Sequence, residues 1–173
     1  APGFGIFHKY LATAVTAHDD SAGSPDMRTE YGYGGGAGWR QESLQFANLP
    51  NMTWDDYRGY STVTIDTGVV GAAHASRNVN TYFRGMDGDK YANGTSKSVS
   101  LTDYDGNSYP DAIYLTGYEL QTRTFNASGY EVTSAWHQYW VGMGVSGPGV
   151  HDSHAIRTAV TRSRDALSAG GWR

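Results

Sequence analysis

The sequence has no cysteine in its 173 residues, which excludes a disulfide framework, a thiolate metal site and a cysteine nucleophile. Long apolar runs are also missing. The longest, such as GVVGAA at residues 68 to 73, cannot span a bilayer, so no membrane partner is expected. Charged residues make up only 17% of the chain, and the formal net charge is -4. A general polyanion-binding surface is therefore not expected, and any nucleic-acid role needs a local basic patch.

Glycine and tyrosine are abundant instead, with 23 and 13 copies, which suits short strands joined by many turns. Apolar and polar residues alternate in many stretches, as in half-buried strands. Turn-rich clusters separate these stretches without intervening helices, which predicts a single domain with an N-terminal hairpin and an antiparallel sheet of about five or more strands. The predicted strands are residues 6–15, 27–33, 39–46, 60–66, 78–84, 96–102, 112–125 and 130–143.

Residues 151 to 170 at the C-terminus predict a helix. Asp152 or Ser153 can cap it, and Gly170 with Gly171 ends it. An apolar stripe at the spacing i, i+4, i+7, i+11 consists of Ile156, Val160 and Leu167, with Ala159 and the small Ser163. A lone amphipathic helix must bury its stripe on a sheet, either its own or a partner's. The predicted fold class is therefore α+β, mainly β, with antiparallel strands over residues 1–150.

Three chemical motifs near the C-terminus fail on their context. G-x-G-x-x-G at residues 142 to 147 matches a dinucleotide fingerprint, but we expect no second parallel strand after the predicted helix, as such a site requires. His151 and His154 have the spacing of two metal ligands, yet no third ligand is close in sequence, and capping or exposed histidines are the favoured interpretation. A nucleophile elbow would need glycine where Pro148 stands. We therefore do not expect an enzyme.

The most specific local signal is DYDGNSYPD at residues 103 to 111. Oxygen-bearing side chains occupy positions 1, 3, 5 and 9 of this loop, as Asp103, Asp105, Asn107 and Asp111. Short acids that alternate around a tight turn suit a hard cation, so calcium is the candidate ion. The alternative is a hairpin loop whose Asp and Asn side chains bond their own backbone. The sequence leaves both interpretations open.

The last predicted strand, SAWHQYWVGMGV, runs through a short loop into the predicted helix at DSHAI. With the N-terminal hairpin and the run of antiparallel strands, this order resembles the coat proteins of single-stranded RNA bacteriophages. The resemblance covers the chain in outline and reaches individual residues only around 134 to 160. It implies that two chains join their sheets edge to edge and that the helix of each covers the partner's sheet. The dimers would then close an icosahedral shell around RNA.

The same resemblance implies a polar and aromatic sheet face that binds an RNA hairpin by stacking and hydrogen bonding. The candidate RNA-binding residues are Asn80, Tyr82, Arg84, Ser98, Thr116, Tyr118 and Arg123. The chain departs from the family in being longer, in having one evident helix where two are usual, and in its negative charge. Negative subunits repel packaged RNA unless the inner face is locally basic.

The resemblance thus implies a structural coat protein of the virion, assembled in the bacterial cytoplasm, with itself and single-stranded RNA as partners. No cofactor is required, and calcium at the 103–111 loop is the candidate ion. The alternative is a secreted, calcium-dependent, carbohydrate-binding β-sandwich. The calcium-like loop and the aromatic residues in turns favour that alternative, whereas the scarcity of catalytic motifs favours the coat protein.

Overall fold

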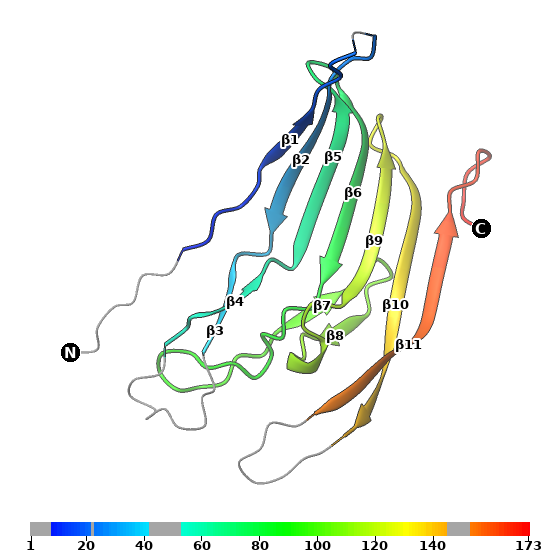
Figure 1. Cartoon of the computed structure of the whole chain (residues 1–173). Helices are drawn as coiled ribbons and strands as arrows, with labels where there is room; N and C mark the ends of the chain where they lie inside the picture. Colours follow the sequence, from blue (N-terminus) through cyan, green and yellow to red (C-terminus); the bar gives the residue numbers. More distant parts are fainter. Residues whose placement is uncertain (1–7, 22, 42–52, 145–152) are drawn as a thin grey trace.

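The structure is a computed structural model, and it describes residues 8–21, 23–41, 53–144 and 153–173. One seven-stranded antiparallel sheet dominates it, with the strand order β1-β2-β5-β6-β9-β10-β11 (Figure 1). The strands are β1 (Ala14–Ala17), β2 (Met27–Gly34), β5 (Thr62–Val69), β6 (His74–Tyr82), β9 (Glu119–Asn126), β10 (Glu131–Met143) and β11 (His154–Asp165). The described residues form one large sheet rather than the two facing sheets of a β-sandwich.

Smaller elements gather at one end of this sheet (Figure 1). Strand β3 (Gly38–Arg40) pairs with β4 (Asp56–Gly59), and β7 (Ser100–Thr102) pairs with β8 (Ser108–Pro110). A short 3-10 helix, η2 (Ile113–Leu115), follows β8. The long connection from β6 to β9 carries β7, β8 and η2, so it forms a partial second layer.

The hydrophobic core lies between this second layer and the sheet. Its buried cluster is small: Phe83, Leu101, Leu120 and Trp136. Leu101 comes from β7, whereas Leu120 and Trp136 come from β9 and β10. The core therefore lies at the end of the sheet where the second layer lies, and Tyr139, which points to the other side of β10 from Trp136, also packs against it.

The strand register divides the sheet side chains into two faces, because residues directly opposite each other point to the same side. One row runs through Thr62, Thr81, Gln121 and Trp136, and the second layer packs on this side. The neighbouring row on the other side runs through Tyr33, Val63, Asn80, Thr122 and Ala135.

The prediction of a C-terminal helix over residues 151–170, and with it the α+β class, is wrong. Residues 154 to 165 form β11, which pairs along the whole length of β10, and the described chain contains no α-helix. Of the predicted docking residues, Ile156 lies opposite Val141 and Val160 lies opposite Gln138, so they are on different faces. Leu167 is in the C-terminal turn and is 45% exposed.

The β-branched content of β11 explains this correction. Ile156, Thr158, Val160 and Thr161 all prefer extended backbone, and β10 offers a long strand to pair with. The register shifts at Gln138/Tyr139, where Ala159 is an extra residue. This bulge changes which residues share a face, so the side chains of β11 do not alternate regularly along the sequence, and their spacing also fits a helical period.

Several predicted strands are confirmed closely. The predictions 27–33 and 130–143 correspond to β2 and β10, and 78–84 overlaps β6. The prediction 112–125 is right only from Glu119 onward, because η2 and a loop precede it. None of the described helical segments is long and apolar enough to cross a membrane.

Candidate functional site

Charge is distributed very unevenly between the two faces of the sheet. We call the side that carries the second layer the charged face and the other side the uncharged face. Glu119 on β9 and Asp165 on β11 also lie on the uncharged face, but on β1, β2, β5 and β6 that face holds no Asp, Glu, Lys or Arg. Its side chains there are Val15, Ala17, Met27, Thr29, Tyr31, Tyr33, Val63, Ile65, Thr67, Val69, Ser76, Asn78, Asn80 and Tyr82.

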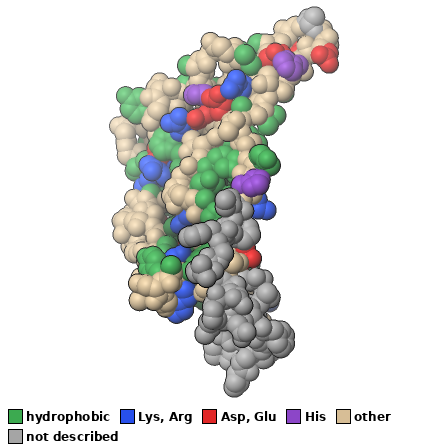
Figure 2. Space-filling model, turned by 90° about the vertical axis from the view of Figure 1, so that its left-hand side faces the viewer, with side chains coloured by type: hydrophobic (Ala, Val, Ile, Leu, Met, Phe, Trp, Pro, Cys, Tyr) green, Lys and Arg blue, Asp and Glu red, His purple; other side chains and the backbone are tan. Residues whose placement is uncertain are grey.

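Ion pairs cover the charged face beyond the second layer. Arg77 donates two hydrogen bonds to Asp66, of 2.6 and 2.9 Å, and Arg28 lies 2.8 Å from Glu30. Figure 2 views the molecule from the β1 side. Acidic, basic and histidine side chains gather in its upper half. Such pairs are typical of a surface that stays in water.

The uncharged face is only partly covered by the chain itself. None of its side chains on β2 and β5 is buried, whereas the core residue Leu120 is fully buried. Its polar side chains bond one another across strands. Thr122 donates to Asn80 at 2.5 Å, and Thr124 donates to Asn78 at 2.7 Å. These bonds reduce the cost of covering the face with a partner, because fewer polar atoms would lose water without a replacement.

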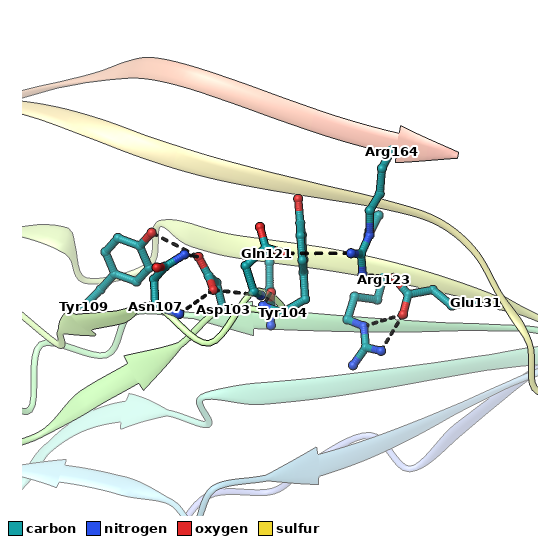
Figure 3. A network of polar contacts seen from close by, with 10 residues as sticks. Asp103, Tyr104, Asn107, Tyr109, Gln121, Arg123, Glu131 and Arg164 are labelled. Carbon is teal, nitrogen blue, oxygen red and sulfur yellow. Dashed lines mark hydrogen bonds and ion pairs between the residues drawn. The ribbon is translucent and has the colours of Figure 1, made fainter. Parts of the chain in front are cut away.

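The predicted calcium residues are not gathered around one point. Asp103 accepts hydrogen bonds from the backbone amides of Asp105 and Asn107, both at 2.9 Å, and from the side chains of Asn107 and Tyr109, both at 3.0 Å (Figure 3). Asp111 is fully buried elsewhere and accepts the amide of Gly85 at 2.8 Å. No metal-ligand group is found within the described residues. Calcium binding stays a prediction.

Asp103 orders the turn between β7 and β8. Burial alone would raise the pKa of Asp103, but hydrogen bonds from Asn107, Tyr109 and the Asp105 amide outweigh it, and the pKa is lowered. The ionised carboxylate therefore holds the loop, as the alternative interpretation of this motif expected.

The ordered turn docks on the sheet through its neighbours. The amide of Tyr104 donates to the side-chain oxygen of Gln121 at 2.8 Å, and the Tyr109 ring lies 5.9 Å from that of Trp136. The Arg164 guanidinium lies 3.9 Å from the centre of the Tyr104 ring. Figure 3 shows these groups converging from the turn, β9 and β11. The turn thus connects the second layer to the edge strand.

Arg164 also joins a charged network at this point. It donates to Ser134 at 2.8 Å and to Glu131 at 3.1 Å, and Arg123 donates to the same carboxylate at 2.9 Å. Burial alone would raise the pKa of Glu131, but the hydrogen bonds from Arg123, Arg164 and Ser134 lower it overall. Glu131 is therefore an ionised link between β9, β10 and β11.

The structure does not bring the predicted RNA-binding residues onto one surface. Asn80 and Tyr82 lie on the uncharged face, while Arg123 lies on the charged face and is paired with Glu131. The remaining four belong to the connection between β6 and β9. Their positions differ: Arg84 donates to the Gly35 and Gly36 carbonyls, Thr116 accepts from Arg58, Tyr118 packs on Tyr139, and Ser98 is exposed.

The candidate RNA-binding residues predicted from the sequence do not include the arginines of β11. Arg157, Arg162 and Arg164 all point to the charged face, and Arg162 lies 5.3 Å from the centre of the Trp136 ring. Only Arg162 and Arg164 are two residues apart, and the five-residue spacing from Arg157 spans the bulge at Ala159, so a period of two in the sequence does not place all three on one face. No protein-family model, no curated protein and no solved structure matches the chain.

Proposed function

We propose that this chain is the self-assembling coat subunit of a small RNA phage, and that its copies enclose single-stranded RNA. The observation that carries the proposal is the uncharged face of the sheet. The assembly is the one predicted from the sequence, but the uncharged face of the sheet joins two subunits in place of the predicted helix.

A sheet is stable when its apolar face is covered by another layer. The second layer of this chain covers only one end of the charged face, and Val63, Ile65, Tyr31 and Tyr33 on the other face stay half-exposed. Depletion of charged residues is the compositional mark of an interface core. A second copy of the chain supplies a matching surface, because the same uncharged residues meet across a two-fold axis.

The first experiment measures the size of the chain after expression alone in bacteria. We expect a particle of megadalton mass that elutes early in gel filtration, appears as a closed shell by electron microscopy and carries nuclease-protected RNA. A stable monomer of 18.8 kDa would overturn the proposal.

A pair of variants tests the uncharged face directly. Ile65 and Thr64 are neighbours on β5 and lie on opposite faces of the sheet. Ile65→Lys would bury an unpaired charge in the interface, so assembly should be lost while the β-sheet circular dichroism is kept. Thr64→Lys is the matched control and should assemble. Shells formed by Ile65→Lys at the wild-type yield would rule out this face as the subunit contact.

A further inference from the structure

A second surface lies on the charged face of β10 and β11, outside the core cluster. It consists of exposed side chains that alternate along both strands: Gln138, Trp140, Arg157, Val160 and Arg162. We call it the Arg–Trp strip. Trp140 is 53% exposed, which is unusual for the largest apolar side chain. It lies directly opposite Arg157.

Gly142 leaves space for the Trp140 ring. A Cβ atom added at Gly142 would lie 2.3 Å from Cη2 and 2.8 Å from Cζ3 of the Trp140 indole. The outer edge of the six-membered ring therefore lies against the glycine, and any side chain at this position would push the ring away. The backbone of Gly142 does not require glycine, because its φ is not positive. What glycine contributes here is room for the Trp140 indole, which stays about half exposed.

The strip is positive in a chain that is negative overall. Residues 134 to 144 and 153 to 164 contain no Asp or Glu, but they contain three arginines. In the part of the chain that the structure describes, Arg157 and Arg162 form no ion pair, whereas Arg164 is bound to Glu131. Two guanidinium groups are therefore available to an external anion: that of Arg157, opposite the exposed Trp140 indole, and that of Arg162, over the buried Trp136 ring.

We propose that the Arg–Trp strip binds single-stranded RNA, with a base stacked on Trp140 and phosphates held by Arg157 and Arg162. Unpaired bases stack on aromatic rings, and guanidinium groups pair with phosphates. A double helix would not offer a free base face to Trp140. A neutral sugar could stack on the ring but would give the two arginines no anion. This inference rests on the proposed packaging of RNA and names the surface that contacts it.

Binding of a fluorescent oligouridine of about a dozen nucleotides, measured by anisotropy, tests the stacking. We expect Trp140→Ala to weaken binding about tenfold or more, and Trp140→Phe to weaken it less. Gly142→Val should weaken binding too, because it displaces the ring. Trp172→Ala is the matched control, since Trp172 is also exposed, at 43%, but lies in the C-terminal turn. Equal affinity of wild type and Trp140→Ala would overturn the inference.

The salt dependence of the same binding tests the arginines. Each phosphate contact contributes about 0.7 to the slope of log K against log salt for single strands. The double variant Arg157→Gln, Arg162→Gln should therefore reduce the steepness of this slope by about 1.4. The double variant Arg157→Lys, Arg162→Lys should keep the wild-type slope. An unchanged slope in the glutamine variant would mean that these arginines do not hold phosphate.

The outcomes separate this inference from the coat proposal. Shells that package RNA while Trp140→Ala binds oligouridine normally would keep the coat function and reject the strip. Wild-type protein that binds oligouridine through the strip but stays a monomer would reject the coat function and keep the strip. Binding of a neutral oligosaccharide, lost in Trp140→Ala and independent of salt, would assign the ring to sugars instead.

Discussion

At the scale of single residues, Asp103 explains why the β7–β8 turn has its shape. Its two oxygens accept four hydrogen bonds, from two backbone amides and from the Asn107 and Tyr109 side chains. The side chain is buried, so a truncation would leave these donors without a partner. The residue therefore matters for stability whether or not an ion binds nearby.

We expect Asp103→Ala to lower the free energy of unfolding by about 2–4 kcal/mol, because several buried donors lose their acceptor. Asp105→Ala, two residues away with a half-exposed side chain, should change it by about 0.5 kcal/mol or less. Urea denaturation of both variants measures the difference. A similar loss in the two variants would show that the hydrogen bonds of Asp103 are not what holds the turn.

Glu131 predicts how stability depends on pH. Its pKa in the folded protein lies below the ordinary value of 4.5. The stabilisation is therefore complete above the unfolded pKa and is lost as the pH falls through the lower folded pKa. Melting temperatures measured from neutral to acidic pH should drop less steeply in Glu131→Gln than in the wild type. Parallel curves would contradict the role of this ionised carboxylate.

At the scale of elements, β11 is the clearest difference between expectation and structure. A helix over residues 151 to 170 would need a sheet on which to bury its apolar stripe, whereas β11 is already paired with β10. A strand at the edge of a sheet offers unpaired backbone groups to other chains, and charged side chains discourage such contacts. The C-terminal turn adds protection, because the Asp165 and Arg173 backbones exchange two hydrogen bonds of 2.9 Å.

A substitution at Leu167 tests whether the C-terminal residues form a docking helix or a strand followed by a turn. On a helix, Leu167→Asp would place a charge on the docking stripe and abolish assembly. In the C-terminal turn, where Leu167 is 45% exposed, we expect normal assembly and a change in stability of about 0.5 kcal/mol or less. Gel filtration and thermal melting measure both. Loss of assembly in this variant would indicate that residues 151–170 dock as a helix or that the turn itself is an interface.

At the scale of the whole molecule, the segregation of charge is the main feature. Ion pairs such as Asp66–Arg77 lie on one face, and uncharged side chains such as Ile65 lie on the other. The ion-paired face is suited to water, and under the proposed function the other face contacts a second copy of the chain. A monomer would leave the uncharged side only half-covered.

This arrangement predicts that stability depends on protein concentration. Association stabilises the folded state by mass action, so the wild-type melting temperature should rise with concentration under conditions where shells dissociate reversibly. Ile65→Lys should melt at a lower temperature that does not vary with concentration. A wild-type melting temperature independent of concentration would contradict stabilisation through association.

The sequence by itself determined the local features. Alternation predicted β2 and β10 almost to their ends. The DYDGNSYPD motif predicted a tight turn in which Asp103 bonds its own backbone, as one of two interpretations. These features depend on neighbouring residues, whose preferences for extended backbone and for turns are already present in the unfolded chain.

Only the tertiary structure decided how these pieces combine. Pairing with β10 selected a strand over a helix for β11, and a bulge placed Ile156 and Val160 on opposite faces. Register across strands put Arg123 on the opposite side from Asn80. The path of the chain buried Asp111 away from Asp103. Each outcome depends on partners far apart in sequence, and a shift of one residue reverses every face, so local pattern could not determine them.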